Sequence, residues 1–218
     1  MLINDLKANN LNKGYELSYY NACSEFSRWD PLDMSVASGS NFDTATQTFL
    51  LNYVDEEYKI KFPSGEIRYA AKDEMVPIAV KIVLIHYLVR ASGQSLKNHW
   101  ISFREISQGG LIYFPAFNNR VIKYLLAVFS KNPLGFVNAG KFLGGTDFSC
   151  GDYGIQLTVL PHLPIVFGMW DGDEEFVPRA AVLFDATAPL YLPTEDLVVA
   201  SAFCVSKFVK AGKTLAIS

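Results

Sequence analysis

Hydrophobic positions recur with helical spacing in some segments of the chain and with strand spacing in others. Helical spacing, in which apolar positions recur every third or fourth residue, predicts helices at 12–29, 31–38, 77–91, 118–132, 136–143 and 195–211. Alternating or continuous apolar runs predict strands at 46–54, 57–62, 67–70, 111–114, 155–160, 163–170 and 180–185. The first group of strands forms a meander joined by tight turns, and the apolar helix at 77–91 is the expected cover for it.

Polar residues, prolines and glycines mark where the predicted helices begin and end. The expected N-caps are Asp30, which precedes Pro31, then Asn118 or Asn119, and Thr194. Gly93 and Gly212 are expected just past the ends of the helices before them.

The order of these elements predicts an α+β fold, with antiparallel sheets packed against several helices. Strands cluster in two places, with helices between and after them, and there is no strand–helix alternation of the kind that builds a doubly wound parallel sheet. We expect a single domain over residues 1–218 that begins with a helical segment at 1–40. Two lobes that meet in a cleft are the alternative.

The composition excludes several classes of protein. The 218 residues are half hydrophobic and carry a formal net charge of only −3, so the sequence predicts a folded core and gives no basic footprint for nucleic acid. The longest apolar segment, 77–91, contains Lys81, His86 and Arg90 and is too short for a bilayer. The three cysteines are far apart, and the start lacks the apolar core of a signal peptide. We expect a cytoplasmic protein with no membrane segment.

Several phrases of the sequence resemble domain-of-unknown-function family 3786. They are WISFREISQGGLIYFPAF, the Gly144-Gly145 pair, LPHLPIVFGMWDGDEEFVPRAAVLFD and YLPTEDL, and the likeness runs from about residue 46 to 203. The resemblance implies a protein of anaerobic bacteria and archaea without an established activity. Some relatives carry a four-cysteine iron–sulfur module like that of corrinoid proteins, which this chain lacks. The resemblance therefore suggests an association with corrinoid or one-carbon metabolism, and transfers no residue roles.

The acidic stretch WDGDEEF is the candidate metal site. Asp171, Asp173 and Glu174 follow an apolar strand, and Asp185 ends the next one. Clustered carboxylates suit hard divalent cations, provided that Asp185 and Glu195 fold in beside the turn. The alternative is a solvated turn whose carboxylates cap backbone amides, since Asp-Gly is a strong turn signal and no calcium-loop signature is present.

A second set of residues has the chemistry to contact a ligand or cofactor. Cys150, Asp152 and Tyr153 lie in the glycine-rich segment GGTDFSCGDYG, where the backbone can approach a ligand closely. The other candidates are His86, His162, Trp170 and Arg104. His86 has the alternative of a core histidine, and Arg104 that of an ion pair with Glu105. His162 lies at a corner stiffened by two prolines, where an exposed histidine could reach a ligand, and Trp170 ends an apolar strand.

We weigh three functions. The first is a small-ligand or cofactor-binding protein, for which a corrinoid, another tetrapyrrole or a one-carbon cofactor are the first ligands to test. The second is a metal-dependent enzyme that uses the carboxylates between Asp171 and Asp185. The third is an accessory or assembly protein that acts through its surface. The sequence leaves open whether the protein is an enzyme and what its oligomeric state is.

Overall fold

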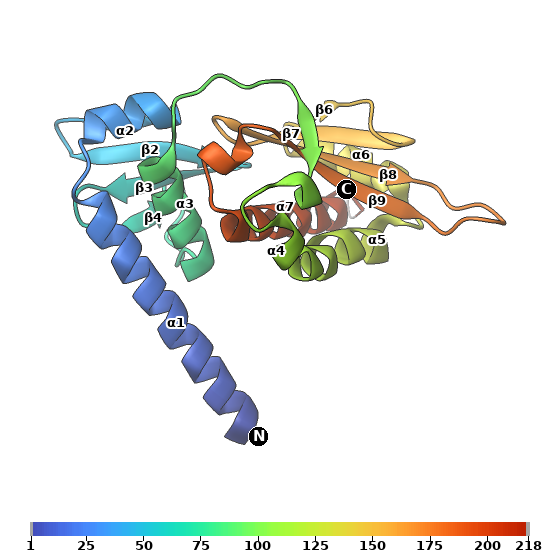
Figure 1. The fold of residues 1–218 in the computed structure, drawn as a ribbon, viewed down its shortest axis with the longest axis horizontal. Coiled ribbons are helices and arrows are strands. Elements are labelled where there is room, and N and C mark those ends of the chain that lie inside the picture. The colour runs from blue at the N-terminus through green and yellow to red at the C-terminus, as the bar shows by residue number, and fades with distance from the viewer. Residues whose placement is uncertain (1, 217–218) are drawn as a thin grey trace. The chain divides into compact units, whose positions relative to one another are not determined.

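The fold is α+β, as predicted, with two antiparallel sheets and helices packed against them (Figure 1). The structure is a computed structural model that describes residues 2–216, with side chains described from residue 13 onward. The chain divides into two compact units, residues 1–93 and 94–218, each of which has its own sheet. We describe each unit by itself.

The first unit begins with two helices in the predicted places. Helix α1 spans Leu2–Phe26, and α2 spans Pro31–Ser38. The carboxylate of Asp30 accepts hydrogen bonds from the amides of Leu32 and Asp33, which confirms Asp30 as the N-cap. Gly39 ends α2 in the left-handed conformation, where glycine carries no Cβ penalty.

A four-stranded meander follows, in the order β1-β2-β3-β4. Its strands are β1 Asn41–Asp43, β2 Thr48–Tyr53, β3 Glu56–Lys61 and β4 Ile67–Tyr69. Three of them confirm the predicted strands, while the three-residue β1 was too short to leave a pattern. Along β3 the buried Tyr58 and Ile60 alternate with exposed charged residues, as expected for a sheet with one covered face.

Helix α3, Ile78–Arg90, confirms the predicted buried helix of the first unit. Within that unit it packs against α1 and α2, and the hydroxyl of Tyr87 donates to the carbonyl of Ser38 at 2.9 Å. Its C-cap is Ala91 and not Gly93, although Gly93 has the positive φ that was expected of a cap.

The second unit contains a five-stranded sheet in the order β5-β9-β8-β7-β6. Its strands are β5 Trp100–Ser102, β6 Thr146–Asp147, β7 Tyr153–Leu160, β8 Leu163–Trp170 and β9 Arg179–Asp185. The three long central strands are the predicted ones. Seven of the eight residues of β8 are buried, so the central strand is covered on both faces.

Where a strand was predicted at 111–114, the chain forms helix α4, Gly110–Phe117. The run Leu-Ile-Tyr-Phe has high strand propensity, but packing overrides it: Phe117 stacks on Phe103 with ring centroids 4.1 Å apart. The prediction of an N-cap at Asn118 or Asn119 is also wrong, because the helical backbone continues through these residues. A π-turn, η2 Asn118–Ile122, joins α4 to α5 Lys123–Phe129, so no new helix begins there.

Two further helices complete the second unit. Helix α6, Pro133–Phe142, begins at the N-cap Asn132, and α7 spans Thr194–Leu215. Thr194 is not the N-cap of α7, which is Pro193, and Gly212 lies inside the helix because α7 continues past it. Two 3₁₀ turns, η1 Phe103–Glu105 and η3 Ala188–Leu190, lie in the connections.

Aromatic side chains form the core between the sheet and helices of the second unit. The ring of Phe208 of α7 packs edge-on against Phe167 of β8, with centroids 5.1 Å apart. It also packs in a tilted arrangement against Phe136 of α6, with centroids 5.2 Å apart. None of the helices in the described part of the chain is both long and apolar enough to cross a membrane.

Candidate functional site

The glycine-rich segment before β7 lies flat against one face of the sheet of the second unit. The amide of Phe148 donates to the carbonyl of Gly154, and the amide of Asp152 donates to the carbonyl of Met169, at 3.0 and 2.9 Å. A Cβ on Gly154 would collide with the Phe148 carbonyl, and one on Gly168 would collide with the sulfur of Cys150. The two strand glycines therefore make room for this segment.

Cys150 lies at the bottom of this packing. Its side chain is buried against Gly168, and burial raises the pKa of the thiol. A raised pKa keeps the sulfur protonated at neutral pH and so lowers its nucleophilicity. Cys150 therefore packs in this fold as a small apolar side chain.

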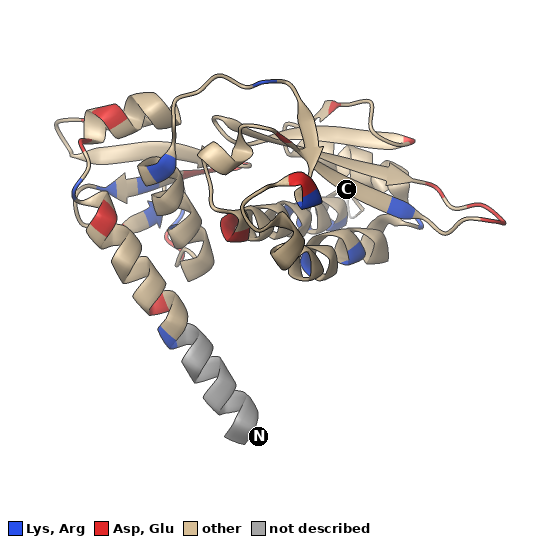
Figure 2. Cartoon of the chain, viewed as in Figure 1, with Lys and Arg blue, Asp and Glu red and all other residues tan. Residues whose placement is uncertain are grey.

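The acidic turn is an ordered hairpin tip between β8 and β9 (Figure 2). One carboxylate oxygen of Asp173 accepts hydrogen bonds from the amides of Glu175 and Phe176, at 2.8 and 2.7 Å. The amide of Asp173 in turn donates to the carbonyl of Phe176 at 2.9 Å. This is the amide-capping geometry that the sequence offered as the alternative to a metal site.

Next to this turn, Asp152, Tyr153 and Asp171 form a small polar cluster. The Tyr153 hydroxyl donates to the carboxylate of Asp171 at 3.0 Å, and the Asp171 amide donates to the carboxylate of Asp152 at 2.9 Å. The hydrogen bond to Asp171 raises the pKa of the Tyr153 phenol. The structure thus brings together three of the residues predicted to contact a ligand or metal.

Asp185 lies at the other end of β9, because Arg179 at the start of that strand pairs with Trp170 beside the acidic turn. The carboxylate of Asp185 is buried and accepts hydrogen bonds from the amide and hydroxyl of Thr187 and from the amide of Lys97. The structure does not bring Asp185 to Asp171, Asp173 and Glu174. Among the described residues, no three His, Cys, Asp or Glu side chains form a group that could hold a metal ion.

The remaining predicted contacts lie on other elements of the chain. His162 packs against the ring of Tyr191 with centroids 5.5 Å apart, and His86 lies half-buried in α3 of the first unit. Arg104 does not pair with Glu105: its guanidinium stacks on Phe114 at 3.8 Å, while Glu105 accepts from the amide of Ser102 at 2.7 Å. Glu195 lies in the first turn of α7, where its negative charge interacts favourably with the positive end of the helix dipole.

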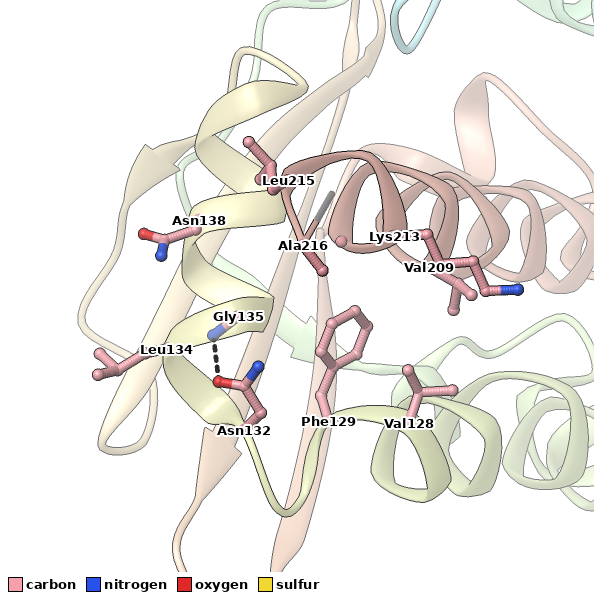
Figure 3. Close-up of a pocket in the computed structure, with 11 residues that line it drawn as sticks. Val128, Phe129, Asn132, Leu134, Gly135, Asn138, Val209, Lys213, Leu215 and Ala216 are labelled. Atoms are coloured by element: carbon pink, nitrogen blue, oxygen red, sulfur yellow. Dashed lines mark hydrogen bonds between the residues drawn. The ribbon is translucent and has the colours of Figure 1, made fainter. Parts of the chain in front are cut away.

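A hollow in the second unit, which we call the helical hollow, has a volume of about 360 Å³ (Figure 3). It lies where α5, α6 and the end of α7 meet, and its walls are mainly apolar. The lining residues are Val128, Phe129, Asn132, Leu134, Gly135, Asn138, Val209, Gly212, Lys213, Leu215 and Ala216. Sequence reasoning missed it, because these residues share no motif and come from three helix ends.

A second hollow lies wholly in the first unit, along β4 and the segment that follows it, and has a volume of about 770 Å³. We call it the strand-edge hollow. It is lined by Lys59, Glu66, Ile67, Arg68, Tyr69, Ala70, Ala71, Lys72, Asp73, Glu74, Met75, Val76 and Lys81. In contrast to the helical hollow, charged side chains dominate its walls.

The fold and these sites define an α+β protein of two compact units with a hollow in each. A family model described as "Domain of unknown function (DUF3786)" matches residues 30–207, and the chain belongs to this family. No curated protein and no solved structure matches the chain.

Proposed function

We propose that the protein binds a compact small molecule in the helical hollow. The observation that carries this proposal is the hollow itself, an apolar recess of about 360 Å³ with a few polar groups at its margin. Ligand pockets are typically clefts of roughly 300–1,000 Å³, lined by apolar side chains with a small number of polar groups that fix the ligand's orientation. Three free cysteines, two of them buried, fit the reducing cytoplasm as the place of action.

The lining favours a ligand with an apolar body and an acidic group. Val128, Phe129 and Val209 offer apolar surface, and Lys213 carries the positive charge at the edge of the hollow (Figure 3). The volume is near the lower end of the usual range, which favours a ligand smaller than a tetrapyrrole. A corrinoid or haem, suggested by the family's associations, is therefore the contrasting arm of the test.

Binding can be measured by thermal shift and calorimetry with short- and medium-chain carboxylates, benzoate, a corrinoid and haem. Lys213→Gln should weaken binding of a carboxylate about tenfold, because an ion pair to the ligand is lost. Lys210→Gln is the matched control: it removes the same charge from an exposed position of α7 that does not line the hollow.

Val209→Phe tests the apolar part of the hollow, since the larger ring would occupy ligand space. It should abolish binding while the variant still melts cooperatively. The proposal is overturned if no compound of the panel gives saturable binding, or if Val209→Phe binds as tightly as the native protein. A corrinoid that binds unaffected by both substitutions would place the ligand site elsewhere.

Helix α4 supports a second function, that of an accessory protein which binds a partner protein. Leu111 and Ile112 are adjacent in sequence and are 73% and 80% exposed, which is unusual for large aliphatic side chains. If this face binds a partner, Leu111→Ser with Ile112→Ser should abolish capture of that partner from a lysate of the source cells. Val36→Ser, at an 83% exposed position of α2, is the matched control and should leave capture unchanged.

A further inference from the structure

Two cationic side chains stand directly opposite each other on the meander of the first unit. Lys59 of β3 and Arg68 of β4 are paired in the antiparallel register. Their neighbours Tyr58, Ile60 and Ile67 are buried, so both charged side chains project from the uncovered face. Like charges in this arrangement repel each other, unless a negative charge lies between them.

This pair lines the strand-edge hollow together with two more cations, Lys72 and Lys81. Glu56 and Glu74 neutralise Lys72, whose ammonium lies 2.6 Å from a carboxylate oxygen of Glu56. That hydrogen bond is the main reason why the pKa of Lys72 is raised. The charge of Lys72 is therefore already neutralised by carboxylates of the chain itself.

Arg68 retains donors for a further anion. Its Nε and Nη2 both reach a single carboxylate oxygen of Glu66, at 2.9 and 2.7 Å, and a guanidinium carries five N–H donors in all. Lys59 and Lys81 make no ion pair with any residue in the part of the chain that is described. Overall the charges balance, since Glu56, Glu66, Asp73 and Glu74 match the four cations in number. The preference for an anion therefore rests on the local juxtaposition of Lys59 and Arg68.

Backbone amides add to this preference. The ladder bonds from Lys61 to Glu66 and from Ala70 to Glu57 show which residues of this segment point toward β3. By the alternation of an antiparallel ladder, Ile67 and Tyr69 direct their N–H and C=O groups to the free edge of β4. Both residues line the hollow, so the open edge supplies uncharged donors beside the cations.

We propose that the strand-edge hollow binds a small oxyanion with several oxygen atoms, a phosphate or a polycarboxylate, held between Lys59 and Arg68. The site differs from the helical hollow in its place in the chain and in the chemistry of its ligand, so it goes beyond the function proposed above. All its residues fall within 30–207, the family match, whereas the helical hollow draws on α7 beyond residue 207.

The test uses the full chain labelled with ¹⁵N and titrated with inorganic phosphate, pyrophosphate and citrate at constant ionic strength. Saturable shifts of the Lys59, Arg68 and Tyr69 amides are expected, and Lys59→Gln should weaken the apparent affinity about tenfold. The strongest of the three anions identifies the class, phosphate or polycarboxylate.

Lys61→Gln is the matched control. Lys61 is exposed on the same face of β3, two residues from Lys59, and does not line the hollow. If Lys61→Gln weakens binding as much as Lys59→Gln, the attraction is diffuse and the site is not built as proposed. The absence of saturable shifts with all three anions would also overturn the proposal.

Discussion

At the scale of single residues, the buried carboxylate of Asp185 is a structural junction. It ends β9 and accepts from the amides of Lys97 and Thr187, so the segment before β5 and the turn after β9 meet at one side chain. Burial by itself would raise the pKa of Asp185, but the hydrogen bonds from Thr187, Lys97 and Asn98 outweigh burial and lower it. Asp185 thus stays charged in the folded protein through the donors on its Oδ1, while its buried Oδ2 has no hydrogen-bond partner in the described part of the structure.

Asp185→Asn should lower the free energy of unfolding by about 1–3 kcal/mol, because an amide replaces a carboxylate among donors. Since the pKa is lower in the folded state, the native carboxylate stabilises the fold fully above the unfolded pKa of about 4. This contribution is lost as the pH falls through the folded pKa. The difference between native and variant, measured by urea unfolding, should be largest near pH 7 and shrink below about pH 4.

Asp171→Asn serves as the control for this prediction, since Asp171 is an exposed carboxylate that accepts from Tyr153. Its effect should stay within about 0.5 kcal/mol. Equal losses for both variants would show that Asp185 acts only through the net charge of the protein.

At the scale of elements, the sequence correctly predicted the helices and strands that are specified by their own pattern of apolar residues. The strands β7, β8 and β9 and the helix α7 carry long apolar patterns, and each formed where expected. Errors arose where packing partners distant in sequence decide the outcome. The segment 111–114 reads as a strand, yet becomes helical under contacts such as Phe103 with Phe117. The helical hollow was missed for the same reason, since it exists only once α5, α6 and α7 meet.

Gly212 makes the same point for α7, because glycine reads as a helix end and yet lies in the last turns of the helix. Gly212→Ala should stabilise the protein by about 0.5–1 kcal/mol, since alanine loses less backbone entropy in a helix. A methyl group there would lie 3.4 Å from Cε1 of Phe129, an ordinary contact. Differential scanning calorimetry measures the expected rise in melting temperature.

Gly14→Ala in α1 is the comparison for this change, because a Cβ at Gly14 meets no atom within 4 Å. It brings the same gain in helix propensity without a new contact. Should Gly212→Ala lower the melting temperature while Gly14→Ala does not, the end of α7 must pack on Phe129 more tightly than the structure indicates.

At the scale of the whole molecule, the division into two compact units is the main feature. The stretch 92–99 includes the division between the units at 93/94, has no helix or strand, and most of its residues are exposed. Inside each unit, by contrast, the sheet and helices bury large aromatic side chains such as Tyr58 and Phe208. Resistance to local opening should therefore be high within each unit and lowest near the start of this stretch, since Gln94 accepts from the Tyr191 hydroxyl and the Lys97 amide donates to Asp185.

Limited digestion of the native protein with a protease of broad specificity should cut first between residues 92 and 97, because exposed backbone without regular structure is the preferred substrate. Mass spectrometry of the early fragments locates the cut. The hairpin tip at 171–178 is the internal comparison, since it is exposed but ordered by the hydrogen bonds of Asp173. A first cut at that tip would contradict the expected order.

The packing of Cys150 against Gly168 has a consequence for which sequences this fold can accept. A Cβ on Gly168 would meet the sulfur of Cys150 and would also come within 2.7 Å of its carbonyl oxygen. Positions 150 and 168 are therefore not free to change independently: a larger residue at 168 requires both a smaller one at 150 and a lifted loop. Across the family, such a replacement should appear together with changes in the length or composition of the segment before β7. The sequence of the glycine-rich segment, which predicted a contact with a ligand, is thus constrained by its packing on β8.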